Sequence, residues 1–146
     1  MQKKNNIISL TLSLSLIIIF NFNSYIYADE FNISAIEISI DKENNIIIGK
    51  GNVEAVDSEG KIIRADKITY EKSKEFLSAE GSVTILDKKN NVLKTDKATY
   101  DKMNELINTF QNSKIILNEG YEISSSKILY DIANNNPEVQ IIYPVH

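Results

Sequence analysis

The sequence predicts an all-β protein, an antiparallel β-jellyroll in which two sheets of bent strands face each other. Three observations predict this fold. Apolar residues alternate over most segments after residue 30, the pattern recurs about every thirty residues, and turn-forming clusters separate the segments at hairpin spacing. No segment after residue 30 keeps the spacing of an amphipathic helix over about ten residues. A parallel β-solenoid, with about thirty residues in each coil, is the alternative, and the tight turns favour the antiparallel form.

Residues 1–28 have the pattern of a secretory signal peptide. Lys3 and Lys4 precede an uncharged, mostly apolar stretch over 7–20, and Ala28 is the natural cleavage position. An uncleaved membrane anchor is the alternative. The segment holds two of the 16 basic residues and none of the 20 acidic ones, so the predicted domain, 29–146, has 14 basic residues against 20 acidic ones. This net charge of −6 argues against nucleic acid or anionic lipid as an electrostatically driven partner, and the absence of cysteine excludes disulfides.

Within the domain, units of about thirty residues follow one another, near 36–50, 51–80, 81–110 and 111–140. The second and third units share nine identities. These include Gly51 with Gly81, Asp57 with Asp87, Asp66 with Asp96 and Tyr70 with Tyr100. A fixed period of this kind indicates one supersecondary unit that is copied and stacked.

Each unit is predicted to contain two strands that bend near the middle. Ile63 and Ala65 share one parity, whereas Ile68 and Tyr70 share the other, so the alternation breaks at Asp66–Lys67. Similar breaks or interrupting glycines occur at Asp96–Lys97, near Ser126–Lys127, at Gly51 and at Gly81. The turns are expected at 57–60, 71–74 and 87–90, and the helix-like segment 101–110 is predicted to be a strand because it aligns with one.

The inward positions of these strands are mostly aliphatic, with few large aromatic residues, and they form the candidate lipid-contact set. Its members are Val53, Ile63, Leu77, Val83, Ile85, Leu93, Ile107, Ile115, Leu117 and Ile123. Such an interior is either a plain core or an open groove that accepts acyl chains. The terminal strands, one at 36–40 and one near the C-terminus, would offer unpaired backbone groups for strand addition by a partner.

The residue types predict no enzyme, no metal site and no cofactor. The only histidine is His146, the last residue, and there is no cysteine, so the usual nucleophile and zinc arrangements are missing. Asp66 and Asp96 recur beside lysines, which indicates a structural bend or a solvated pair. Tyr70, Tyr100 and Tyr130 are expected to close strand ends, with the ring buried and the hydroxyl in water, and an aromatic binding ladder is the alternative.

The segments "GKGNVEAVDSEGKIIRADKITYEK" and "FLSAEGSVTILDKKNNVLKTDKATYDK" resemble the OstA-like domain. That domain occurs in the periplasmic lipopolysaccharide-transport bridge protein and at the N-terminus of the outer-membrane lipopolysaccharide-assembly protein. The resemblance covers about residues 36–132. It implies a half-open jellyroll in the periplasm of a Gram-negative cell, without catalytic activity. The expected ligand is lipopolysaccharide, with the acyl chains of lipid A held in the interior.

By the same resemblance, the expected partners are other jellyroll components of the transport bridge, or further copies of this chain, joined through edge strands in complexes at the inner or outer membrane. Four alternatives remain at the level of the sequence. The chain is a fragment of the assembly protein, an inner-membrane-anchored relative, a secreted β-solenoid that acts on or adheres to polysaccharide, or an assembly module without a ligand.

Overall fold

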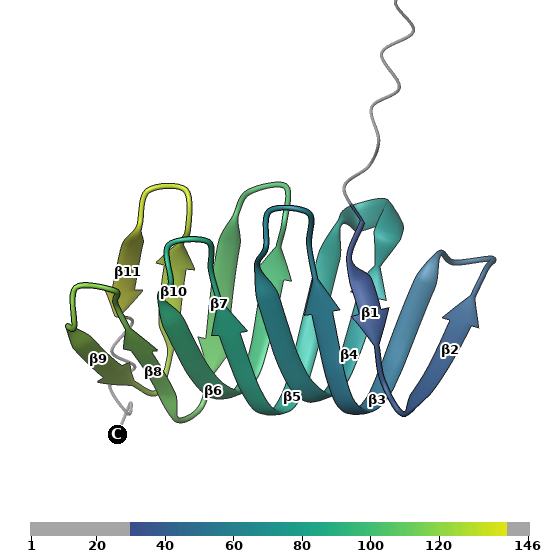
Figure 1. Ribbon diagram of the computed structural model, residues 1–146, viewed down its shortest axis with the longest axis horizontal. Helices are drawn as coiled ribbons and strands as arrows, with labels where there is room; N and C mark the ends of the chain where they lie inside the picture. The colour runs from purple at the N-terminus through teal and green to yellow at the C-terminus, as the bar shows by residue number, and fades with distance from the viewer. Residues whose placement is uncertain (1–29, 140–146) are drawn as a thin grey trace, which may run out of the picture.

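A computed structural model describes residues 30–139 (Figure 1). In this range the chain forms one eleven-stranded sheet whose pairings are all antiparallel. The strands are β1 (Asn32–Ser34), β2 (Glu37–Asp41), β3 (Ile46–Val56), β4 (Ile62–Glu71), β5 (Phe76–Leu86), β6 (Val92–Asp101), β7 (Leu106–Phe110), β8 (Ser113–Ile116), β9 (Glu122–Ser125), β10 (Ile128–Asp131) and β11 (Asn136–Val139). The predicted signal peptide, 1–28, and the tail, 140–146, lie outside the described residues. The antiparallel jellyroll is confirmed, and the parallel solenoid is wrong.

The sheet folds over on itself, so that it makes two facing halves (Figure 1). The β2 half contains β2, the 46–50 part of β3, 67–71 of β4, 76–80 of β5, 97–101 of β6, and β7, β10 and β11. The β1 half contains β1, 53–56 of β3, 62–65 of β4, 83–86 of β5, 92–95 of β6, and β8 and β9. The long strands β3 to β6 therefore pass through both halves.

A row of bulges makes the bends between the halves. The register shifts between Lys50 and Val53 in β3 and between Arg64 and Lys67 in β4, and matching shifts follow in β5 and β6. The backbone is left-handed at Gly51–Asn52, Gly81–Ser82 and Gln111–Asn112, which are thirty residues apart. Bulges of this kind bend a strand and reverse the faces of the residues beyond them. The breaks predicted at Asp66–Lys67 and at the two glycines are confirmed.

At Gly81, the bend of β5 excludes a side chain. Its φ is +80°, and a Cβ there would lie 2.3 Å from the Asp66 carboxylate oxygen. Only a residue without a Cβ fits this position without displacing its neighbour.

The predicted turns at 57–60 and 87–90 are present, and 71–74 forms the short 3-10 turn η2 (Lys72–Lys74). The expectation of a strand over 101–110 is wrong in its first half, because 102–105 is a turn and β7 begins only at Leu106. Strand β1 was not expected, because it precedes the first predicted unit. Within residues 30–139, no helix is long and apolar enough to span a bilayer.

Candidate functional site: the apolar interior and its seam

The ten residues of the candidate lipid-contact set all belong to the space between the two halves. Eight of them are at most 2% exposed. Leu117 and Ile123 are partly buried and pack against the same core. Their alternation along the strands places them on one face of each half. Sequence reasoning therefore located the interior correctly, whatever occupies it.

Aromatic rings fill much of this interior. Tyr70, Tyr100 and Tyr130 are the largest fully buried side chains, so the expectation of few large aromatics inside is wrong. Phe31 packs edge-on against Tyr70 and Tyr100, with centroid distances of 5.2 and 6.1 Å. The halves are in contact in this state, and eight of the ten side chains of the candidate lipid-contact set are covered.

Two recesses lie along the bends. One, of about 350 Å³, is lined by Asn52, Val53, Glu54, Arg64, Ala65, Asp66 and Ser82. The other, of about 700 Å³, is lined by 111–114 and 124–126. Most of the residues that line them are polar.

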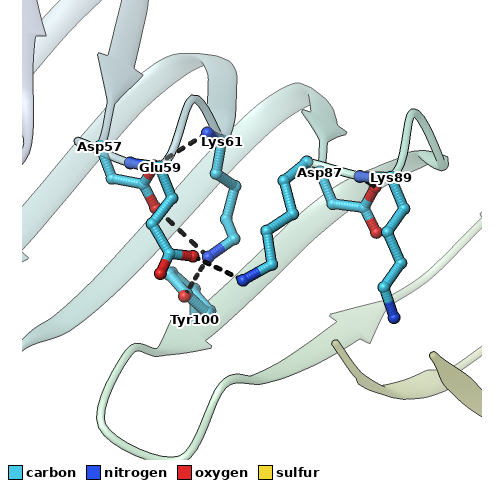
Figure 2. Close-up of polar contacts among 7 residues, drawn as sticks. Asp57, Glu59, Lys61, Asp87, Lys89 and Tyr100 are labelled. Atoms are coloured by element: carbon cyan, nitrogen blue, oxygen red, sulfur yellow. Dashed lines mark hydrogen bonds and ion pairs between the residues drawn. The ribbon is translucent and has the colours of Figure 1, made fainter. Parts of the chain in front are cut away.

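Opposite the bends, the rims of the two halves meet along a line that we call the seam. Its first polar contact, the first clasp, consists of Asp57, Lys61 and Tyr100 (Figure 2). Lys61 is 1% exposed, and its Nζ lies 3.2 Å from Asp57 Oδ2. The same ammonium donates to the Tyr100 hydroxyl and lies 4.4 Å from the ring centroid. Asp57 and Lys61 flank the β3–β4 turn of the β1 half, whereas Tyr100 lies on β6 in the β2 half, so the contact joins the two halves.

Asp57 also builds the turn that presents Lys61. Its Oδ1 accepts hydrogen bonds from the backbone N–H groups of Glu59 and Lys61, at 3.0 and 2.8 Å. An aspartate that bonds to backbone groups a few residues ahead stabilises a tight turn. One carboxylate thus fixes the loop with one oxygen and neutralises the buried lysine with the other.

A second clasp lies thirty residues further along and consists of Asp87, Asn91, Tyr130 and Asn135. Asp87 Oδ1 accepts from the backbone N–H groups of 89 and 91, as in the first turn. The Tyr130 hydroxyl donates to Asp87 Oδ2 at 2.6 Å, and the Asn91 side-chain amide lies 2.8 Å from that hydroxyl and 2.8 Å from Asn135 Oδ1. Asn91 takes the place of Lys61, so this clasp holds an uncompensated carboxylate through neutral donors.

Burial raises the pKa of the Tyr100 phenol well above its ordinary value of 10.0, and the negative charges of Glu105 and Asp57 add to the effect. The pKa of Tyr130 is raised in the same direction, first by burial and then by its hydrogen bond to Asp87. Both phenols therefore stay protonated over the physiological range. The expectation that these hydroxyls reach water is wrong for Tyr100 and Tyr130, since they bond to buried groups across the seam.

The seam continues toward the N-terminus with other contacts. Lys72 Nζ, in η2 of the β2 half, lies 2.9 Å from Glu30 Oε2, which precedes β1. Phe31 stands at the position equivalent to Lys61 and Asn91, and it meets Tyr70 through its ring instead of a polar group. The next equivalent residue, Tyr121, is 70% exposed and has no later unit of the described chain to pack against.

The two ends of the sandwich differ. At the β2 end, Ile38 and Ile40 lie opposite Gly49 and Ile47 on the inward face, yet they are 45% and 63% exposed. At the other end, Pro137 lies in the edge strand β11 opposite Tyr130. A proline in an edge strand removes a donor that a further strand would need.

Sequence reasoning did not identify the clasps, although one signal pointed to them. Asp57 and Asp87 are equivalent in the repeat, but the sequence alone does not show that Lys61 and Asn91 lie against the tyrosines one unit further on. Among residues 30–139, no three potential ligands of the His, Cys, Asp and Glu types gather as a metal site would require.

Comparison with known proteins supports the fold. No family model and no curated protein matches the chain. A solved structure that does match is LptH of Pseudomonas aeruginosa, described as the LptA homologous periplasmic component of the conserved lipopolysaccharide transport device. The TM-score is 0.66 at 16% identity, over 76% of this chain and 82% of that one. The jellyroll is therefore shared with LptH.

Proposed function

We propose that this protein is a periplasmic carrier of lipopolysaccharide that holds the acyl chains of lipid A among the ten inward aliphatic residues. The observation that carries the proposal is the interior itself, a continuous apolar face on each of two halves. Two further features support it. One is the shared fold with LptH, a component of a lipopolysaccharide transport device. The other is the signal-peptide pattern of residues 1–28, which would direct the chain to the periplasm.

An acyl chain that enters this interior removes its own apolar surface from water, which contributes roughly 25 cal/mol per Å². Val83, Ile85 and Leu93 are already buried, so on the protein side the acyl chain replaces existing apolar contacts. The side chains there are covered in the present state. Binding therefore requires the halves to move apart, and the proposed ligand replaces contacts that the halves make with each other.

The protein is also proposed to join other jellyroll components, or its own copies, through edge strands. Strand β2 supports this, because it contains no proline and its inward face carries the exposed Ile38 and Ile40. A partner strand added there would cover both isoleucines and extend the sheet. No step of this function requires catalysis.

Photo-crosslinking in lipopolysaccharide-producing cells tests the proposal. A photoreactive amino acid at Ile85 should capture lipopolysaccharide, because this position faces the interior. The same amino acid at Thr84, the next residue, should not, because successive side chains of a strand point to opposite faces. Equal capture at both positions, or capture at neither, contradicts lipid binding in the interior.

A further inference from the structure

We infer that the two clasps form a latch, and that acyl chains reach the interior when the halves separate at the seam while the bends act as the hinge. The inference deepens the proposed function and rests on it for the identity of the ligand. It assigns control of access to Lys61, Tyr100, Asn91 and Tyr130, none of which belongs to the candidate lipid-contact set.

The clasps divide cleanly between the halves. In the first clasp, the Asp57–Lys61 ion pair lies within one turn of the β1 half, and only the hydrogen bond and the ring contact to Tyr100 cross the seam. Opening therefore leaves Lys61 paired with its carboxylate. Separating a buried ion pair would be far more costly than separating a neutral hydroxyl from it.

The second clasp divides in the same way. Asp87 and Asn91 stay together on the β1 half, where the amide lies 2.8 Å from Asp87 Oδ2. Tyr130 and Asn135 stay together on the β2 half, at 3.0 Å. Each side thus keeps a hydrogen-bonded pair when the seam opens, and water can satisfy the remaining groups.

The opposite edge of the sandwich is suited to be the hinge. There the halves are joined by the backbone of β3 to β6, and the ladder is already interrupted at each bulge. A change of angle at the bulges leaves the strand pairing within each half intact. No comparable covalent connection closes the seam over the described residues, where only side-chain contacts hold the halves together.

The structure also shows why a ligand can reach the interior only after the halves separate. Ile85 and Leu93 are each 2% exposed, and the Tyr100 ring is buried among the same core residues. No buried side-chain nitrogen or oxygen of the described residues lacks a hydrogen-bond partner. The closed state is therefore fully satisfied, and its contacts must be exchanged for those of a ligand.

The first experiment measures opening without any ligand. Because the chain contains no cysteine, Ile85→Cys gives a single reactive thiol in the interior, and its labelling rate by a small maleimide reports exposure. Tyr100→Phe combined with Tyr130→Phe removes one hydroxyl from each clasp and should raise this rate roughly tenfold. Tyr121→Phe is the control, because Tyr121 is 70% exposed and belongs to neither clasp. It should leave the labelling rate unchanged. Circular dichroism confirms that the variants are folded, and equal labelling in all of them overturns the latch.

The second experiment closes the seam instead of weakening it. Glu30→Cys and Lys72→Cys, which replace a cross-seam ion pair, are joined by a short bis-maleimide. The control joins Glu59→Cys and Lys88→Cys, an ion pair at 2.9 Å between two turns of the same β1 half. Uptake of the fluorescent fatty acid cis-parinaric acid should fall at least roughly tenfold in the cross-seam variant and stay near that of the unlinked protein in the control.

The outcomes of these experiments distinguish a failure of the latch from a failure of the proposed carrier function. Uptake that is equally fast in both linked variants shows that chains enter elsewhere, such as the β2 end, and overturns the latch while the carrier function stands. Absence of uptake in the unlinked protein, together with absence of capture at Ile85, refutes the proposed function. The maleimide rates then still decide whether the seam opens.

Discussion

The bend and the seam hold the same two halves together by different means. At the bend, the backbone continues from one half into the other, and left-handed residues recur at Gly51–Asn52, Gly81–Ser82 and Gln111–Asn112. At the seam, side chains alone make the connection, through Lys61 with Tyr100 and through Asp87 with Tyr130. One edge is thus joined by continuous backbone, whereas the other, over the described residues, is joined by side-chain contacts. Substitutions at the bend should therefore affect folding, whereas substitutions at the seam should affect stability and access together.

The largest effect is expected at the bend, from Gly81→Ala. The new Cβ would lie 2.3 Å from Asp66 Oδ2, and the left-handed backbone is unfavourable for alanine. We expect a loss of about 3 kcal/mol in the free energy of unfolding, measured with urea. Gly60→Ala is the control, because φ is +85° there but nothing lies within 4 Å of the added Cβ. It should cost about 1 kcal/mol, and equal losses would show that the contact with Asp66 is unimportant.

The next largest effect is expected at the seam, from Lys61→Ala. This change leaves the buried Asp57 carboxylate without its ammonium. Removing one partner of a buried ion pair costs about 3 kcal/mol, and thermal or urea unfolding would measure it. Arg64→Ala breaks the exposed pair with Glu54 and should cost less than about 1 kcal/mol. Similar losses for the two variants would mean that Lys61 is not truly desolvated.

Lys61→Asn tests how much the charge of the lysine contributes to the stability that the first clasp provides. Asn91 shows that an amide at this position reaches both the aspartate and the tyrosine hydroxyl, each at 2.8 Å. We therefore expect Lys61→Asn to restore the contact that Lys61→Ala removes, with a loss of only about 1 kcal/mol. A loss as large as that of Lys61→Ala would show that the first clasp depends on the ion pair alone.

The sequence predicted the local features of this molecule and missed the contacts between its two halves. Parity changes at Asp66–Lys67 and the glycine at 81 are local features, so the bends could be placed without any three-dimensional information. The inward set followed from alternation for the same reason. The clasps could not be placed, because they join residues about forty positions apart whose proximity depends on how one half lies over the other. A lysine is seldom buried unless it has a partner, so the residue type gives no indication that Lys61 is buried.

Phe31 was missed for a related reason. It lies before the first predicted unit, where no repeat partner upstream could mark it, yet it closes the N-terminal part of the seam against Tyr70. The pattern predicts the tyrosines at strand ends, with their hydroxyls in water. A strand end faces water only when no rim lies opposite, and in a folded-over sheet each rim faces another.

The smallest effect should appear in alkali. The pKa of Tyr100 and of Tyr130 is raised in the folded state above the ordinary 10.0, so the folded protein binds these two protons more tightly than the unfolded chain does. Their contribution to stability is complete below pH 10.0 and is lost as the pH rises above it, because the unfolded chain then releases protons that the folded state retains. Tyrosinate absorbance should show that the phenols of Tyr100 and Tyr130 are among those that ionise only as the protein unfolds. Tyr100→Phe and Tyr130→Phe should each remove one of them. If both phenols ionise together with the exposed ones while the fold persists, the seam opens so readily in alkali that its hydroxyls are not held as the structure shows.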